Sequence, residues 1–219
     1  MVKLENGAQL RLRGRSRRQQ DQRQTTRRNL LEAAKRQFTE LSYTVTTIDD
    51  IAKDAGVSRT TFYRHFDSKW AIAQTLFAEV GAPIRLLHEH MAAVVNPTDT
   101  QIRQWLGKVL DVLDANKPLV QAMREADAIE PDSDEVVTAT HDEMIRMFAT
   151  HSPAFKAASS RAASNAEART RAHLLLLQFD QFCYAVVVRK SIDREAAIRV
   201  MAQQFRRFID LRAGRERGE

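Results

Sequence analysis

Apolar residues recur at helical spacing along most of the chain, and short polar stretches divide them into segments. The first clear segment predicts a helix over about residues 25–41. Its apolar positions lie on one helical face: Leu30, Leu31, Ala34, Phe38 and Leu41. Glycine and proline are scarce, with 7 and 5 in 219 residues, and residues that favour helices dominate. The pattern therefore predicts an all-α protein.

Two short helices follow, and their ends are marked by capping residues. Thr47 with Asp50 three positions later predicts a capping box at the start of the second helix. Gly56 is expected to end that helix, because glycine adopts left-handed backbone angles without steric cost. Ser58 is expected to cap a third helix over residues 59–65. The arrangement predicts a helix-turn-helix.

The third helix is polar except for Phe62, with Phe66 just beyond it, so it can bury only one narrow stripe. An ordinary helical hairpin inside a core would need a wider apolar face. Its remaining surface carries side chains that donate hydrogen bonds: Arg59, Thr60, Thr61, Tyr63 and His65. DNA is rich in matching acceptors, on its phosphates and on its base edges.

Positive charge is concentrated in the first third of the chain. The formal net charge is +6, and residues 1–70 contain 15 Lys and Arg against 8 Asp and Glu. Residues 1–22 form a predicted flexible arm that carries Arg11, Arg13, Arg15, Arg17 and Arg18. This arm is either a solvated tail or a segment that follows the DNA backbone or enters a minor groove.

The rest of the chain predicts further helices and a loop near residues 152–164 that contains Pro153. The helices are expected near residues 102–114, 119–128, 135–151, 166–189 and 193–212. The lone Cys183 lies in an apolar run and indicates a core residue in a reducing cytoplasm. No signal segment or stretch able to span a bilayer is found, so a cytoplasmic protein without membrane association is expected.

Residues from Leu30 to Lys69 resemble the DNA-binding segment of the TetR family of bacterial transcriptional regulators. The matching motifs are Leu30-Leu31-Glu32-Ala33-Ala34, Thr46-Thr47-Ile48, Ala55-Gly56-Val57-Ser58 and Thr61-Phe62-Tyr63-Arg64-His65-Phe66-Asp67-Ser68-Lys69. Ser42 departs from the pattern, because glycine is usual there. The resemblance implies about nine helices, with an arm at 1–22, a DNA-binding domain at 23–70 and an effector-binding and dimerisation domain at 71–219.

The resemblance also assigns roles within the helix-turn-helix. Arg59 and Thr60 are expected to read bases, while Thr47 and Lys69 are expected to hold phosphates. The full predicted DNA-binding set is Thr47, Ser58, Arg59, Thr60, Thr61, Tyr63, His65 and Lys69. The expected partner is a palindromic operator in double-stranded DNA, bound by a homodimer that forms through the last two helices.

A small apolar effector is expected to bind in the larger domain and release the DNA. The apolar candidates for the pocket, each of which is more often plain core than pocket wall, are Trp105, Met123, Met144, Met147, Phe148, Phe179 and Tyr184. The polar candidates are Gln178 and Asp180. Asp180 needs a polar partner if it is buried, either Arg124 or a group of the ligand. Alternatively, Gln178 and Asp180 face solvent or pair across the dimer.

No motif for catalysis, a metal or a cofactor is found, so the chain is not expected to be an enzyme. Two other functions stay open. The chain could be a ligand-independent regulator or activator that uses the arginine-rich arm. It could also be a helical enzyme or carrier that merely retains the DNA-binding domain.

Overall fold

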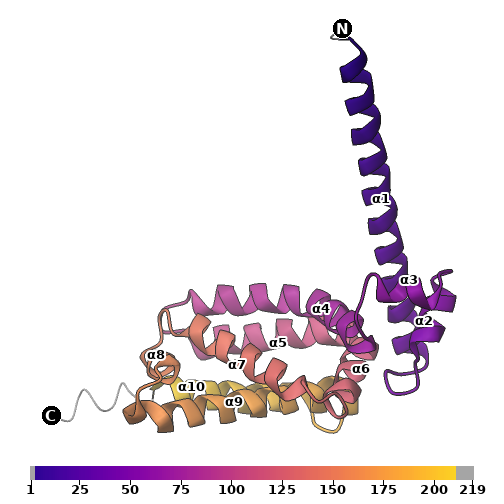
Figure 1. Cartoon of the computed structure of the whole chain (residues 1–219). Helices are drawn as coiled ribbons and strands as arrows, with labels where there is room; N and C mark the ends of the chain where they lie inside the picture. Colours follow the sequence, from indigo (N-terminus) through magenta and orange to yellow (C-terminus); the bar gives the residue numbers. More distant parts are fainter. Residues whose placement is uncertain (1–2, 211–219) are drawn as a thin grey trace. The chain divides into compact units, whose positions relative to one another are not determined.

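The computed structural model describes residues 3–210, with side chains from residue 19 onward (Figure 1). This part is all-α, as predicted, with ten α-helices, one 3-10 turn and one π-helical segment. It divides into two compact units, Met1–Leu76 and Phe77–Glu219, which we call unit 1 and unit 2. Within residues 3–210, no helix has both the length and the apolar character needed to cross a membrane.

Unit 1 contains α1 (Lys3–Glu40), α2 (Ile48–Asp54), α3 (Arg59–Tyr63) and the first two turns of α4 (Lys69–Ala92). These helices enclose a small apolar core. Its buried residues are Leu30, Ala33, Ala34, Phe38, Tyr43, Ile51, Ala52, Phe62, Phe66, Ile72, Ala73 and Leu76. The predicted helical face is therefore correct at Leu30, Ala34 and Phe38 in the last part of α1, whereas Leu41, just beyond the helix, is 53% exposed.

The predicted start of the first helix near residue 25 is wrong, because α1 begins at Lys3. The segment contains no proline, and its many arginine and glutamine residues favour helix once a helix is nucleated. The five arginines of the predicted arm lie in this segment: Arg11, Arg13, Arg15, Arg17 and Arg18. Their side chains are outside the described residues, so their contact with DNA stays a prediction.

The loop between α1 and α2 is held by hydrogen bonds to its own carbonyl groups. Ser42 has a positive φ of 97°, a conformation that favours glycine. The Thr46 hydroxyl donates to the carbonyl oxygens of Ser42 at 2.7 Å and Gln37 at 3.2 Å. Lys69 Nζ donates to the carbonyl oxygens of Tyr43 at 2.8 Å and Thr46 at 3.1 Å. The loop thus places α2 through main-chain contacts.

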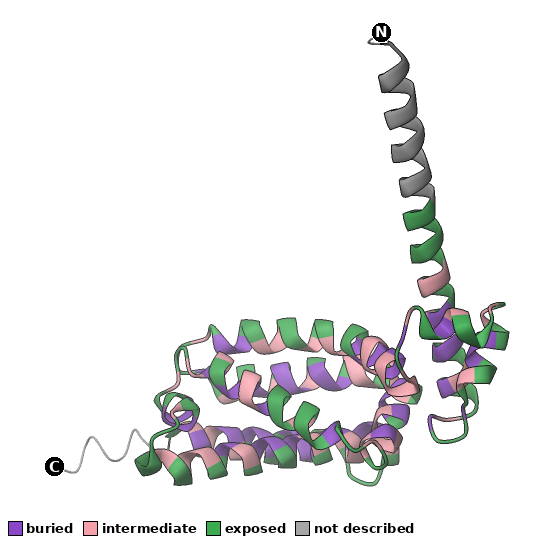
Figure 2. Cartoon of the chain, in the orientation of Figure 1, coloured by how far each residue is buried: buried purple, intermediate pink, exposed green. Residues whose placement is uncertain are grey.

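Unit 2 is a helical bundle in which α9 and α10 lie side by side and α5 packs against α10 (Figure 1). Its elements after α4 are α5 (Asp99–Ala115), α6 (Lys117–Asp127), α7 (Ser133–Phe148), α8 (Pro153–Ser159), a 3-10 turn (Ala163–Asn165), α9 (Ala166–Tyr184), a π-helical segment (Ala185–Arg189) and α10 (Arg194–Asp210). Figure 2 shows the buried residues on the helix sides that face one another.

An aromatic cluster forms the centre of unit 2. The Trp105 ring stacks on Phe179 at 5.7 Å between centroids and meets the edge of Phe205 at 5.0 Å. Phe148 adds an edge contact to Trp105 at 5.7 Å and stacks on Phe155 at 5.1 Å. Offset-stacked and edge-to-face pairs of this kind stabilise a core beyond the area they bury.

The helix α8 corrects the prediction of a loop over residues 152–164. The Ser152 hydroxyl accepts a hydrogen bond from the Phe155 backbone N–H, and Pro153 occupies the first turn. Serine as a cap followed by proline is a helix start signal. Alanine-rich sequence then continues the helix, and Phe155 anchors it because its side chain is fully buried.

Candidate nucleic-acid interface

The helix-turn-helix is fixed by caps at both of its helix starts. The Thr47 hydroxyl accepts from the Asp50 backbone N–H at 3.2 Å, and the Thr47 backbone N–H donates to the Asp50 carboxylate at 3.0 Å, which confirms the predicted capping box. Gly56 has a φ of +68° in the turn, as expected. The Ser58 hydroxyl accepts from the Thr61 backbone N–H at 3.1 Å. The local sequence therefore determines where α2 and α3 begin.

Phe62 anchors α3 to the core of unit 1. Its side chain is fully buried and lies 5.9 Å from the ring of Phe66, measured between centroids. The Arg27 guanidinium covers the other ring at 4.2 Å from the Phe66 centroid. With one side of the helix buried in this way, Arg59 and Tyr63 are directed to the exposed side. Thr60 and Arg64 are also exposed.

Arg59, the predicted base reader, is engaged with two neighbours. Its Nη1 lies 2.8 Å from Asp49 Oδ2, and its Nη2 donates to the Tyr63 hydroxyl at 3.4 Å. The ion pair is exposed on both sides, so it is weak and easily exchanged. No sequence signal marks this pairing, because Arg59 and Asp49 lie on different helices.

Three of the predicted DNA-binding residues have local partners within unit 1. The hydroxyl groups of Thr47 and Ser58 serve as caps, and the Lys69 ammonium binds two loop carbonyls and lies over the Tyr43 ring at 4.2 Å. A group held in this way is less available to a phosphate than a free side chain. Their contact with DNA stays a prediction.

A salt bridge with additional hydrogen bonds links α1 to α2, and it was not predicted. Arg36 binds Asp54 through two hydrogen bonds of 3.0 and 3.2 Å, and the Gln37 amide donates to the same carboxylate at 3.3 Å. The hydrogen bonds from Arg36 lower the pKa of Asp54 below its ordinary value, so the carboxylate stays charged. No sequence signal marks this pair, since 18 residues separate its members.

His65 lies close to three arginine side chains of unit 1. Partial burial lowers the pKa of its imidazole, and Arg23, Arg64 and Arg27 lower it further by repulsion. The ring is therefore neutral near pH 7, while the guanidinium groups around it remain charged. This is an environment that attracts anions and in which a nearby phosphate would favour protonation of His65.

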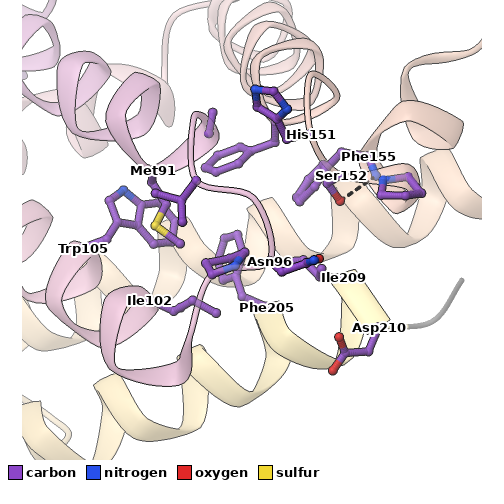
Figure 3. Close-up of a pocket in the computed structure, with 15 residues that line it drawn as sticks. Met91, Asn96, Ile102, Trp105, His151, Ser152, Phe155, Phe205, Ile209 and Asp210 are labelled. Carbon is purple, nitrogen blue, oxygen red and sulfur yellow. Dashed lines mark hydrogen bonds between the residues drawn. The ribbon is translucent and has the colours of Figure 1, made fainter. Parts of the chain in front are cut away.

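The predicted pocket residues are dispersed within unit 2. Trp105 and Phe148 line a cavity of about 180 Å³, whereas Met144 and Phe179 belong to the surrounding core. Met123 is half-buried and does not line this cavity. Figure 3 shows the cavity, whose further walls come from Met91, Ile102, Phe155 and Phe205 and which the sequence did not indicate.

The polar candidates lie elsewhere. Gln178 is exposed and lines a shallow depression between α9 and α10. Asp180 Oδ2 lies 2.8 Å from His141 Nε2, so its partner is the buried His141 and not Arg124. Arg124 instead covers the Tyr184 ring at 5.1 Å. Of the two polar residues in the apolar helix α9, Asp180 therefore has a partner within the chain, and Gln178 faces outward.

Comparison with known sequences agrees with this geometry. Residues 30–81 match the sequence model of the family described as bacterial regulatory proteins, tetR family. Residues 30–81 are therefore a TetR-family DNA-binding segment. They include all of α2 and α3, and the family is one of transcriptional regulators, in agreement with the prediction of a regulator.

A curated sequence relative matches part of the chain. HTH-type transcriptional regulator TtgR from Pseudomonas putida is 35% identical over 83 residues. The match spans only 38% of this chain and 38% of that relative. The likeness in sequence to this relative therefore covers little more than a third of either chain.

Solved structures extend the likeness to the whole fold. A protein from Syntrophomonas wolfei str. Goettingen described as a TetR-family transcriptional regulator has a TM-score of 0.61 at 19% identity and covers 84% of this chain and 94% of its own. A transcriptional regulator from Aquifex aeolicus VF5 has a TM-score of 0.55 at 19% identity, covering 83% and 98%. At this identity the likeness concerns the fold alone.

Proposed function

We propose that the protein is a DNA-binding transcriptional repressor that acts as a homodimer and is released from a palindromic operator by a small apolar effector. One observation carries the DNA-binding part. The helix α3 is anchored by the buried Phe62, and its opposite side presents Arg59, Thr60 and Tyr63 to solvent. A short helix with exposed donors suits the major groove, where arginine can bind guanine through two hydrogen bonds.

Selection of bound DNA from a random pool tests this function. We expect two half-sites related by symmetry and separated by about one helical turn of DNA or more, because each protomer of a dimer would place one helix-turn-helix in the major groove. Arg59→Ala should weaken binding by about 1–3 kcal/mol and relax the preference at one base position. Lys108→Ala, which removes an exposed positive charge in unit 2, is the matched control. Equal weakening on every sequence would contradict base reading by Arg59.

The pair between Asp49 and Arg59 gives a second test of the same surface. DNA must compete with Asp49 for the guanidinium, and the carboxylate also repels phosphates. Asp49→Asn should therefore strengthen binding, most clearly at low salt, where exposed charges are least screened. Weaker binding by the variant would mean that Asp49 holds Arg59 in its reading position.

Exposed apolar residues on α9 and α10 support the dimer. Leu174 and Leu177 on α9 are 60% and 49% exposed, and Val200 on α10 is 52% exposed. A paired surface of this kind favours burial against a second copy. Leu177→Glu should give a monomer in analytical ultracentrifugation. Leu86→Glu, at an equally exposed position on α4, is the control and should leave the dimer intact.

The cavity in unit 2 supports the effector. An effector releases DNA only if it binds the DNA-free form more tightly than the operator-bound form. Titration of the operator complex with small apolar compounds separates this repressor from the ligand-independent regulator. If compounds bind the protein but none of them releases the operator DNA, the ligand-independent alternative is favoured.

A further inference from the structure

We infer that the cavity of unit 2 binds a neutral compound with a single aromatic ring and one small hydrogen-bonding substituent, the chemistry of a simple phenol. This inference rests on the proposed function, because it names the effector class of that cavity. It is argued from the walls, the size and the charges of the cavity.

The inner walls are apolar and mostly aromatic. Trp105, Phe148, Phe155 and Phe205 are all less than 10% exposed, and Met91 lies beside the Trp105 ring (Figure 3). Aromatic rings arranged at different angles present both faces and edges to a bound ring. The methionine sulfur adds a polarisable contact that adapts to the shape of the ligand. Such walls favour a flat apolar ring over a polar or branched compound.

The volume limits the ligand to about one ring. The cavity measures about 180 Å³. An apolar protein cavity of about 150 Å³ is known to stay dry and to bind benzene. The additional space here is enough for a small substituent, but a compound of three fused rings would require the walls to move.

Polar groups lie among the outer lining residues, so the ligand needs one polar group. Asn96 and His151 are exposed, and the Ser152 hydroxyl accepts from the Phe155 backbone N–H, which leaves its own O–H to donate. These side chains offer both donors and acceptors. A hydroxyl group on the ligand can donate to the acceptors and accept from the donors, whereas a purely apolar ligand such as toluene can form neither hydrogen bond.

The charges around the cavity favour a neutral ligand. No Lys or Arg is among its described lining residues, and its one carboxylate is Asp210. Arg206 lies 3.6 Å from that carboxylate and also donates to the Pro97 carbonyl oxygen. A ligand with a carboxylate would therefore have no Lys or Arg among the described lining residues to pair with. A ligand with an ammonium group would have to compete with Arg206 for Asp210. Either charge would lose hydration against the aromatic walls.

Calorimetric titration of the full-length, DNA-free protein with p-cresol tests the inference. We expect one site per chain, with binding tighter by about tenfold or more than that of p-toluate or p-methylbenzylamine, because each of these must bury a charge. Toluene should bind more weakly than p-cresol by a smaller factor. Absence of saturable p-cresol binding, or equal binding of the charged compounds, would overturn the inference.

Two variants locate the bound ring. Ala92→Phe fills the cavity from α4 and should abolish p-cresol binding, with the retained fold checked by circular dichroism. Met91→Ala enlarges the cavity and should shift the preference from p-cresol towards 1-naphthol, so it tests the site even if the filled variant does not fold. Met123→Ala, outside the cavity, is the control and should bind as the wild type does. Unchanged preference in Met91→Ala would overturn the assignment.

The same compound added to the operator complex separates the two proposals. Saturable binding of p-cresol without loss of operator affinity would leave the ligand class standing and contradict its role as a releasing effector. Operator binding by a protein that ignores p-cresol would leave the DNA-binding function standing and overturn the ligand class.

Discussion

His88 makes the stability of unit 2 depend on pH. Its Nδ1 accepts a hydrogen bond from Trp105 Nε1 at 3.1 Å, which requires an unprotonated Nδ1. The imidazole also lies against the rings of Phe179 and Phe148, at 6.0 and 6.4 Å between centroids. Burial lowers the pKa of His88 to about 4. The folded protein therefore keeps this ring neutral at pH values where the unfolded chain protonates it.

The direction and size of the effect follow from proton linkage. Between about pH 4 and 6.5 the unfolded chain binds one more proton at His88, so stability rises with pH by up to about 1.4 kcal/mol per unit. The full stabilisation is present above pH 6.5 and is lost as the pH falls towards 4. Over this range the loss reaches about 3 kcal/mol at most. We expect about 2 kcal/mol, because part of the side chain remains exposed.

The assay compares urea unfolding of the wild type with that of His88→Gln, followed by far-ultraviolet circular dichroism at several pH values. Glutamine can accept the hydrogen bond from Trp105 but does not titrate. The carboxylates and the other histidines contribute equally to both proteins, so the difference in unfolding free energy isolates His88. A difference that stays constant from about pH 4.5 to 7 would refute the reasoning.

Three further changes have expected outcomes in unit 1. Ser42→Gly should stabilise the protein by about 1 kcal/mol, because it relieves the positive φ of 97°; a lower urea midpoint would contradict this. Lys69→Met should lower the free energy of unfolding by about 1–3 kcal/mol, since two carbonyls lose a charged donor. Unchanged stability with weaker DNA binding would instead favour a phosphate contact. DNA binding should strengthen as the pH falls from about 8 to 6, because a phosphate raises the lowered pKa of His65; His65→Gln should remove this dependence in a filter-binding assay.

The sequence by itself determined where α2 and α3 begin and which residue anchors α3 to the core. Thr47 with Asp50, Gly56 and Ser58 act within four residues of their own position, so their roles could be predicted from spacing alone. Phe62 was predictable as the anchor, because it is the one apolar residue expected within a polar helix. Where the interpretation failed, at the start of α1 and at α8, the local signals favoured helix but were outweighed by polar composition and by Pro153.

Only the tertiary structure decided which side chains are engaged and where a ligand fits. Arg59 meets Asp49 across two helices, Lys69 binds carbonyls 23 and 26 residues away, and Asp180 selects His141 at a separation of 39 residues. The cavity beside Trp105 depends in the same way on residues from five different helices. Helical periodicity specifies which face of each helix is apolar. It does not specify which faces meet, because that depends on how all the helices pack together.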